Sequence, residues 1–148
     1  MNDGQMWLDR AVDLAVENVG LDGGPFGAVV VRDGVVIGEG ANRVTADLDP
    51  TAHAEVVAIR NACRQVGDFA LVGATIYASC EPCPLCLASS LWARLDAVVF
   101  AADRHALLDQ RGDVAIDGSL RGLQLGGDRI RRQRLSGAPE HLDDLKKP

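Results

Sequence analysis

Apolar and acidic residues alternate at helical spacing near the start of the chain. Over residues 6–19 the apolar positions that share one helix face are Trp7, Ala11, Leu14 and Ala15. A period of about 3.6 residues predicts an amphipathic helix that packs against a sheet. The stretch Asp22-Gly23-Gly24-Pro25 ends this helix, because glycine and proline interrupt helical structure.

The pattern then changes to β-rich runs at 27–32 and 35–40, joined by Asp33-Gly34. An Asp-Gly pair favours a tight hairpin turn, so the first two strands are predicted to be antiparallel. Asp49-Pro50-Thr51 follows and predicts the start of a helix of about 15 residues, which ends near Gly67.

Strands and helices alternate further along. A third strand is predicted over 74–79, a helix from Pro82 or Pro84 to about Arg94, and a fully apolar, central fourth strand over 97–102. This order predicts an α/β fold with right-handed crossovers and parallel pairing of the later strands. A short helix near 104–110 and a helix or strand past 128 complete the prediction.

Composition limits the classes of function. The length of 148 residues suits one domain, residues 1–148, which can fold without disulfides. The chain shows neither a signal peptide nor an apolar run of about 20 residues, so we expect a cytoplasmic protein with no membrane contact. The net charge of −6 argues against a nucleic-acid partner. The four arginines of 129–134 fit a solvated helix or strand face or, alternatively, an RNA-contacting strip.

Three of the four cysteines, Cys80, Cys83 and Cys86, fall within seven residues. In a chain without an export signal, such clustering indicates metal binding or redox chemistry rather than disulfides. His53-Ala54-Glu55 lies in the first turn of one predicted helix, and Cys83 and Cys86 lie at the start of the next. Both helix N-termini emerge at the same edge of the sheet, so the sequence predicts a metal ion held between them.

His53, Cys83 and Cys86 supply one imidazole and two thiolates, which suit tetrahedral zinc and leave a fourth position for water. Zinc lowers the pKa of such a water to about 7, and Glu55 can take its proton and deliver it to a substrate. Cys80 is the alternative ligand, because Cys80 and Cys83 also form a C-x-x-C pair. We assign Cys83 with Cys86, since Cys80 lies at a predicted strand end and a closed four-ligand site would exclude the water.

Three runs resemble the cytidine deaminase-like superfamily: GGPFGAVVV (23–31), DPTAHAEVVAIRNAC (49–63) and SCEPCPLCLASSLWARLDAVVFAA (79–102). H-x-E followed by P-C-x-x-C is the signature of zinc nucleobase deaminases. Within the superfamily the runs are most similar to bacterial guanine deaminases and related nucleobase deaminases, and next to tRNA adenosine deaminases. The resemblance covers about residues 5–103. It implies a three-layer α-β-α fold with a mixed central sheet, a bound Zn²⁺, and a homodimer formed through helices beside the active site.

The resemblance also implies contacts with the substrate. Asn42 matches the residue that hydrogen-bonds the base, and a turn residue is the alternative interpretation. Phe26 and Trp92 match aromatic residues that enclose the base, with core packing as the alternative. The backbone N–H of Ala54, at a helix start, can meet the substrate or the tetrahedral intermediate.

The chain departs from the guanine deaminases after residue 103. Those proteins carry an acidic pair after a glycine-phenylalanine, whereas here only Asp113 stands near the expected place. No aromatic residue follows Asp103, so the aromatic tail that closes a swapped partner's pocket is missing.

The resemblance therefore implies a hydrolase that releases ammonia from a small-molecule nucleobase. Guanine is the default substrate, and isoguanine, cytosine, 5-azacytosine and amino-triazines are alternatives. Two other functions stay open. One is a tRNA adenosine deaminase, which would need a basic face for phosphates. The other is a non-enzymatic module stabilised by zinc.

Overall fold

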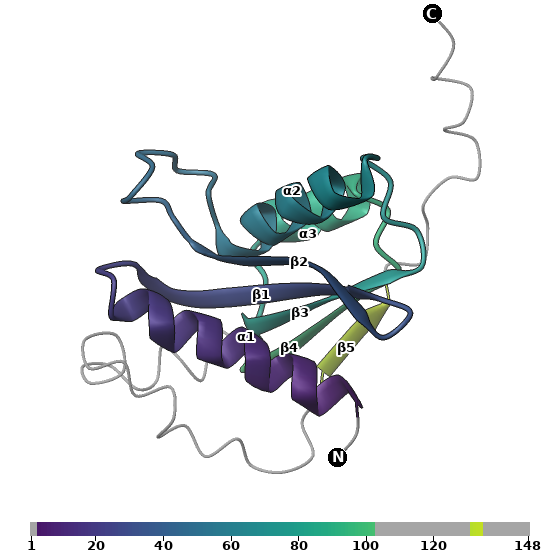
Figure 1. Ribbon diagram of the computed structural model, residues 1–148, viewed down its shortest axis with the longest axis horizontal. Coiled ribbons are helices and arrows are strands. Elements are labelled where there is room, and N and C mark those ends of the chain that lie inside the picture. The colour runs from purple at the N-terminus through teal and green to yellow at the C-terminus, as the bar shows by residue number, and fades with distance from the viewer. Residues whose placement is uncertain (1–2, 103–130, 135–148) are drawn as a thin grey trace, which may run out of the picture.

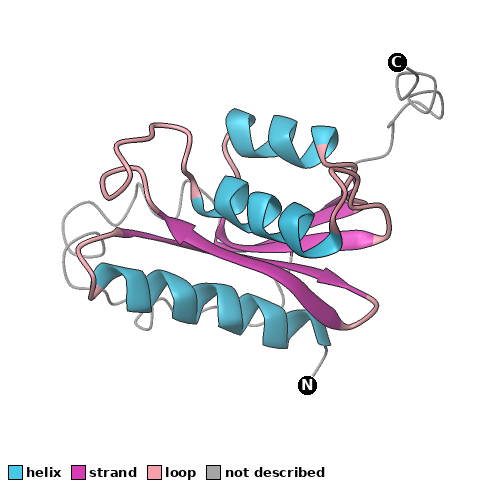
Figure 2. Cartoon of the chain, turned by 45° about the horizontal axis from the view of Figure 1, so that its top comes forward, coloured by secondary structure: helices cyan, strands magenta, loops and turns pink. Residues whose placement is uncertain are grey.

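Helices cover both faces of one β-sheet in the computed structural model, which describes residues 3–102 and the backbone of 131–134 (Figure 1). The elements in chain order are α1 (Asp3–Val19), β1 (Gly24–Arg32), β2 (Val35–Asn42), α2 (Ala54–Val66), β3 (Ala74–Cys80), α3 (Pro84–Trp92), β4 (Ala97–Ala102) and β5 (Arg131–Arg134). α1 lies on one face of the sheet, and α2 and α3 lie on the other (Figure 2). The predicted α/β class with three layers is confirmed.

The strand order in the sheet is β2-β1-β3-β4-β5. β1 is antiparallel to both β2 and β3, β3 is parallel to β4, and β4 is antiparallel to β5. The predicted hairpin and the predicted parallel pairing are both confirmed. Since β2 and β3 both oppose β1, they end at the same edge of the sheet, and α2 and α3 therefore begin there.

The hairpin turn has the geometry that its residues favour. Asp33 and Gly34 have φ of 53° and 72°, and Arg32 pairs with Val35 across the turn. Two successive residues with positive φ define the type I′ turn, whose twist matches that of the flanking strands. The turn thereby sets the register between β1 and β2, and it returns β2 to the edge of the sheet where α2 and α3 begin.

Small residues let α2 lie unusually close to β2. A Cβ added at Gly40 would lie 2.4 Å from the carbonyl oxygen of Ala54, and one added at Gly38 would lie 2.5 Å from that of Ala58. Ala54 and Ala58 are fully buried and share one face of the helix. This contact fixes the first turn of α2, and with it the position of the preceding residue, His53.

The core consists of two apolar clusters, one on each side of the sheet. The larger cluster lies between the sheet and α2, and the smaller one lies between the sheet and α1. Ala11 and Ala15 are fully buried on the predicted apolar face of α1, with Trp7 and Leu14 partly buried beside them. Asn18 continues the buried stripe of this helix with only 9% of its surface exposed, which the sequence pattern did not predict.

The predicted start of α2 is wrong by several residues. Asp49, Pro50 and Thr51 form a separate turn, and the helix begins at Ala54. Asp49 Oδ1 accepts hydrogen bonds from both the backbone N–H and the hydroxyl of Thr51, at 2.8 and 2.6 Å. An aspartate that bonds two residues ahead favours a turn over helix propagation.

The other element limits differ only slightly from prediction. β1 begins at Gly24 rather than 27, β2 runs on to Asn42, and α3 ends at Trp92 before Arg94, whose φ is 56°. Of the alternatives past residue 128, the strand is confirmed by β5. The predicted helix near 104–110 lies outside the described residues, and a single domain over 1–148 stays a prediction. No helix among the described residues is long and apolar enough to cross a membrane.

Candidate metal centre and active site

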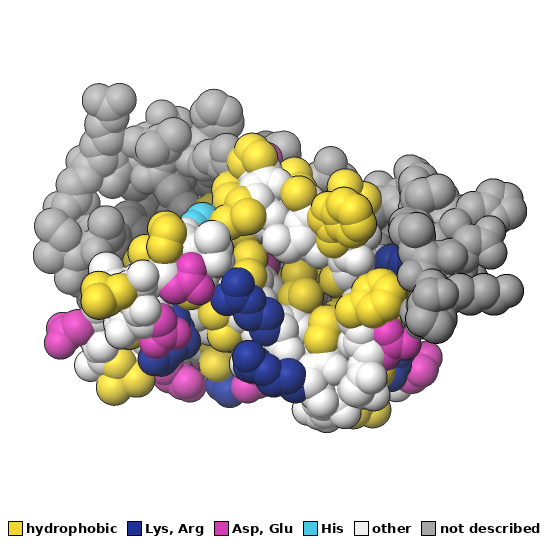
Figure 3. All heavy atoms as spheres, turned by 90° about the horizontal axis from the view of Figure 1, so that it is seen from above, with side chains coloured by type: hydrophobic (Ala, Val, Ile, Leu, Met, Phe, Trp, Pro, Cys, Tyr) yellow, Lys and Arg dark blue, Asp and Glu magenta, His cyan; other side chains and the backbone are white. Residues whose placement is uncertain are grey.

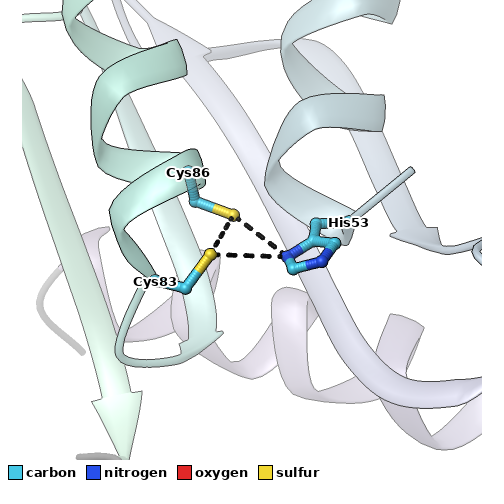
Figure 4. A group of neighbouring side chains, drawn as sticks. All are labelled: His53, Cys83 and Cys86. Atoms are coloured by element: carbon cyan, nitrogen blue, oxygen red, sulfur yellow. Dashed lines mark hydrogen bonds between the residues drawn. The ribbon is translucent and has the colours of Figure 1, made fainter. Parts of the chain in front are cut away.

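Three ligand atoms meet where α2 and α3 begin (Figure 4). His53 Nδ1 lies 3.5 Å from the Sγ atoms of both Cys83 and Cys86, and the two Sγ atoms lie 3.5 Å apart. Across residues 3–102, no other group of three or more histidine, cysteine or acidic side chains comes together in this way. Cys80, at the end of β3, is not part of the group.

The triangle has the size that a tetrahedral zinc ion requires. With zinc–sulfur bonds of about 2.3 Å and zinc–nitrogen bonds of about 2.0 Å, tetrahedral angles put two ligand atoms about 3.5–3.8 Å apart. The observed separations of 3.5 Å fit this range. Three protein ligands leave one coordination position open, as in catalytic rather than structural zinc sites.

Helix starts orient all three ligands. His53 and Cys83 are the N-cap residues of α2 and α3, with extended backbones and ψ of 154° and 170°. Neither side chain caps its own helix, so both are available to the metal. Pro84 occupies the first turn of α3, where proline is tolerated because the N–H it lacks has no helical partner. Cys86 lies three residues after Cys83 and so faces the same side of the helix.

Burial governs the chemistry of Cys86, whose side chain is fully enclosed. Burial raises the pKa of this thiol far above its ordinary value, and the nearby charge of Glu55 raises it further. A cation bound between the three side chains would favour the thiolate form of Cys86.

Glu55 lies beside the metal centre but outside its ligand group. It is the second residue of α2, only 8% exposed, and close enough to Cys86 to hydrogen-bond that thiol. A buried carboxylate next to an open coordination position is well placed to exchange protons there. Its role as the proton shuttle stays a prediction.

Ala54 directly follows His53, and Asn42 precedes a residue that is hydrogen-bonded to the segment before His53. Asn42 is the last residue of β2, and the backbone N–H of Arg43 after it donates to Ala52 O at 2.9 Å, one residue before His53. The Asn42 side chain is partly buried, and its Oδ1 accepts a 3.2 Å hydrogen bond from the backbone of Val44. Ala54 is the first residue of α2 and is fully buried.

Three further residues were predicted to contact the substrate, and the structure describes two of them, Phe26 and Trp92. Phe26, in β1, is partly buried and packs against the larger core cluster. Trp92 is 75% exposed and ends α3, about 13 Å of helical rise away from Cys83. The structure thus neither buries Trp92 in the core nor brings it to the three ligands. Asp113 lies outside the described residues.

Sequence reasoning missed two groups that support the site. One is Asn18, whose side-chain amide donates to the backbone of Asn42. The other is Asp49, which bonds Thr51 and also accepts from Arg60 at 3.3 Å, so that it ties the loop before His53 to α2. A signal for Asn18 was present, because its position falls on the apolar stripe of α1.

Residues 1–102 match the cytidine and deoxycytidylate deaminase zinc-binding region. The chain belongs to this family of zinc-binding deaminases. The match spans His53, Cys83 and Cys86, which form the potential metal site described above, and zinc is the metal of this family.

Curated relatives and solved structures agree with this assignment. Guanine deaminase of Bacillus subtilis is 55% identical over 100 residues, which cover 67% of this chain and 64% of the relative. The tRNA-specific adenosine deaminase of Haemophilus influenzae is 40% identical over 96 residues, or 64% of this chain and 56% of the relative. This family member therefore spans less than two thirds of either relative's length.

Two solved structures resemble the fold. The X-ray structure of the Bacillus subtilis guanine deaminase superposes with a TM-score of 0.69 at 52% identity, covering 71% of this chain and 68% of that one. The guanine deaminase of Nitrosomonas europaea gives a TM-score of 0.66 at 27% identity, covering 70% of this chain and 60% of that one. Both similarities support the three-layer deaminase fold.

Proposed function

We propose that this protein is a zinc-dependent hydrolase that removes an amino group from a free nucleobase as ammonia, with guanine as the first candidate. The observation that carries the proposal is the three-ligand site of His53, Cys83 and Cys86, with the buried Glu55 beside it. The 55% identity to a guanine deaminase supports the substrate class.

The side chains fit hydrolytic deamination. When bound, zinc supplies the Lewis acid that makes water nucleophilic near neutral pH. Glu55 takes a proton from the attacking water and passes it to the ring nitrogen, and it then takes the second proton, from the added hydroxyl, and passes it to the departing amino group. A carbon–oxygen bond forms, the carbon–nitrogen bond breaks, and ammonia leaves.

Other residues would hold the base for this step. The amide of Asn42 offers a donor and acceptors that match a base edge. Phe26 supplies a partly buried aromatic side chain in β1. The backbone N–H of Ala54 lies at the start of α2, where helix N–H groups are free to bind an oxyanion.

The test is an ammonia-release screen of the zinc-loaded chain. The panel holds guanine, isoguanine, cytosine, 5-azacytosine, melamine and adenine, and a Glu55→Gln variant serves as the control. We expect release from at least one free base by the parent chain and none above background by the variant. No release from any base would disprove the proposal, and equal release by the variant would disprove the mechanism.

A tRNA adenosine deaminase is the second candidate, because relatives of that name are 40% identical. The net charge of −6 favours a free base, since binding of a polyphosphate depends on many Lys and Arg contacts. A gel shift with unmodified tRNA at physiological salt tests this alternative. A specific complex, together with inosine formation, would replace the free-base proposal.

We further propose a homodimer that packs through α3. This helix carries no charged residue, and its exposed positions include Leu85, Leu91 and Trp92, at 39%, 46% and 75%. Hydrophobic side chains lie exposed on this side of the molecule (Figure 3). A second copy of the same face can cover them without burying a charge, which is how a twofold interface is built.

The proposed location is the cytoplasm. None of the four cysteines of the described region forms a disulfide, and the sulfur atoms of Cys83 and Cys86 belong to the potential metal site. Free thiol ligands persist where the surroundings are reducing, whereas an oxidising compartment favours disulfides. Cysteine chemistry therefore supports this location.

A further inference from the structure

Asn18 connects α1 to the strand end that carries Asn42. It lies in the last turn of α1 and is only 9% exposed. Its Nδ2 donates two hydrogen bonds of 2.8 Å, one to the carbonyl of Gly24 and one to the carbonyl of Asn42. One buried amide thus holds both ends of the β1–β2 hairpin, where Gly24 pairs with Asn42.

Gly23 and Gly24 lie so close to the Asn18 and Asn42 side chains that a larger residue at either position would push against them. A Cβ added at Gly23 would lie 2.2 Å from Asn18 Nδ2. A Cβ added at Gly24 would lie 3.0 Å from Asn42 Cγ, so the Asn42 amide packs directly on that glycine. Neither glycine has a positive φ, so both serve close packing rather than a special backbone conformation.

The same strand end borders the metal centre. Gly40, two residues before Asn42, contacts the Ala54 carbonyl at the start of α2, and Arg43 bonds Ala52. Asn42 is therefore held from one side by Asn18 and from the other by the segment that carries His53. A shift of its backbone would change where its amide meets a bound base.

We propose that Asn18 is a positioning residue that fixes the Asn42 amide for base binding, a role that rests on the proposed function. Asn18 acts through the Asn42 backbone and touches neither zinc nor substrate. Loss of its two hydrogen bonds should weaken binding of the base while leaving the metal centre and the chemical step intact.

The experiment compares three variants of the zinc-loaded chain. Asn18→Asp keeps the shape but turns the donor into an acceptor that faces two carbonyl oxygens. Gly24→Ala displaces the Asn42 side chain and leaves Asn18 unchanged. Asn61→Ala is the matched control, because Asn61 also donates from a helix to a β2 carbonyl, that of Glu39 at 2.9 Å, but is exposed.

Three readouts separate positioning from general stability. We expect Asn18→Asp and Gly24→Ala to raise KM for guanine about ten-fold, with kcat changed less than about two-fold. Zinc content should stay at that of the parent. Hydrogen exchange of the Val44 amide, which donates to Asn42 Oδ1, should become faster in both variants. Asn61→Ala should leave all three quantities unchanged.

The outcomes distinguish this role from the proposed function. Unchanged KM and unchanged Val44 exchange in a folded Asn18→Asp or Gly24→Ala variant would overturn the positioning role. A lower Tm with KM and exchange unaltered would make Asn18 purely structural and would overturn it too. If the parent chain fails to deaminate guanine, Val44 exchange alone decides whether Asn18 positions Asn42.

Discussion

At the scale of single residues, Cys80 matters because a fourth protein ligand at this position would close the zinc site to water. It lies at the end of β3, outside the group formed by His53, Cys83 and Cys86. We expect Cys86→Ser to lower zinc content from about one ion per chain to near zero, since the remaining donors cannot replace a buried thiolate. Cys80→Ser should keep full zinc content.

Metal analysis after gel filtration measures this difference, with circular dichroism to verify folding. Loss of zinc in Cys80→Ser would show that Cys80 is a ligand and that the site is closed. It would thereby favour the structural zinc module over the enzyme.

Glu55 tests the chemistry at the same scale. Glu55→Gln keeps the size of a buried side chain but removes the carboxylate that is proposed to move protons. General acid–base catalysis of this kind contributes about 10²–10⁴-fold, so kcat for ammonia release should fall by that factor with zinc content unchanged. Glu17→Gln, on the exposed face of α1, is the control and should behave like the parent. A Glu55→Gln variant with normal kcat would remove Glu55 from the mechanism.

At the scale of elements, the contact between α1 and β2 depends on pH. Arg10 binds both carboxylate oxygens of Glu39, at 2.8 and 2.9 Å, and this hydrogen bonding lowers the pKa of Glu39 from its ordinary value of 4.5. A lowered folded-state pKa means that the pair stabilises the fold above about pH 4.5. This stabilisation is lost as the pH falls through the folded-state value.

Denaturant unfolding of the parent and of Glu39→Gln between pH 7 and pH 3 measures the effect. The pair is partly exposed, so the parent should be more stable by about 0.5–1 kcal/mol at pH 7. The difference should shrink below pH 4.5 and be smaller in high salt. Both chains carry the same metal centre, so acid release of zinc cancels in the comparison. A difference that does not vary with pH would contradict the assignment.

At the scale of the whole molecule, the proposed dimer depends on the uncharged face of α3. Sedimentation equilibrium should show a dimer of the parent chain. Trp92→Lys should raise the dimer dissociation constant by about 30-fold or more, because a buried tryptophan commonly contributes about 2 kcal/mol to an interface. Leu21→Lys is the control, since Leu21 is 80% exposed but follows α1. A monomeric parent, or an equal effect of both substitutions, would rule out this interface.

Local patterns in the sequence determined most of the elements and the metal ligands. The apolar period identified α1 and the apolar runs identified the strands over residues 3–102, because burial of one face depends on spacing that the sequence displays, whereas helix-start signals identified α2 and α3. The Asp33-Gly34 turn settled the direction of β2. His53, Cys83 and Cys86 could be chosen because each lies next to a helix start, and helix starts leave recognisable residues such as Pro84.

The tertiary structure decided what depends on contacts between distant residues. Asp49 bonds Thr51 in a separate turn and also accepts from Arg60, eleven residues later; the local pattern of an aspartate before Pro50 fits a helix start equally well, so only the fold shows that α2 begins at Ala54. Asn18 follows an apolar stripe, and only the fold shows that its amide meets the Asn42 carbonyl 24 residues away. The exposure of Trp92 also depends on what packs around α3. Spacing along the chain specifies which atoms can bind zinc, whereas the assembled sheet and helices specify which groups hold them in place.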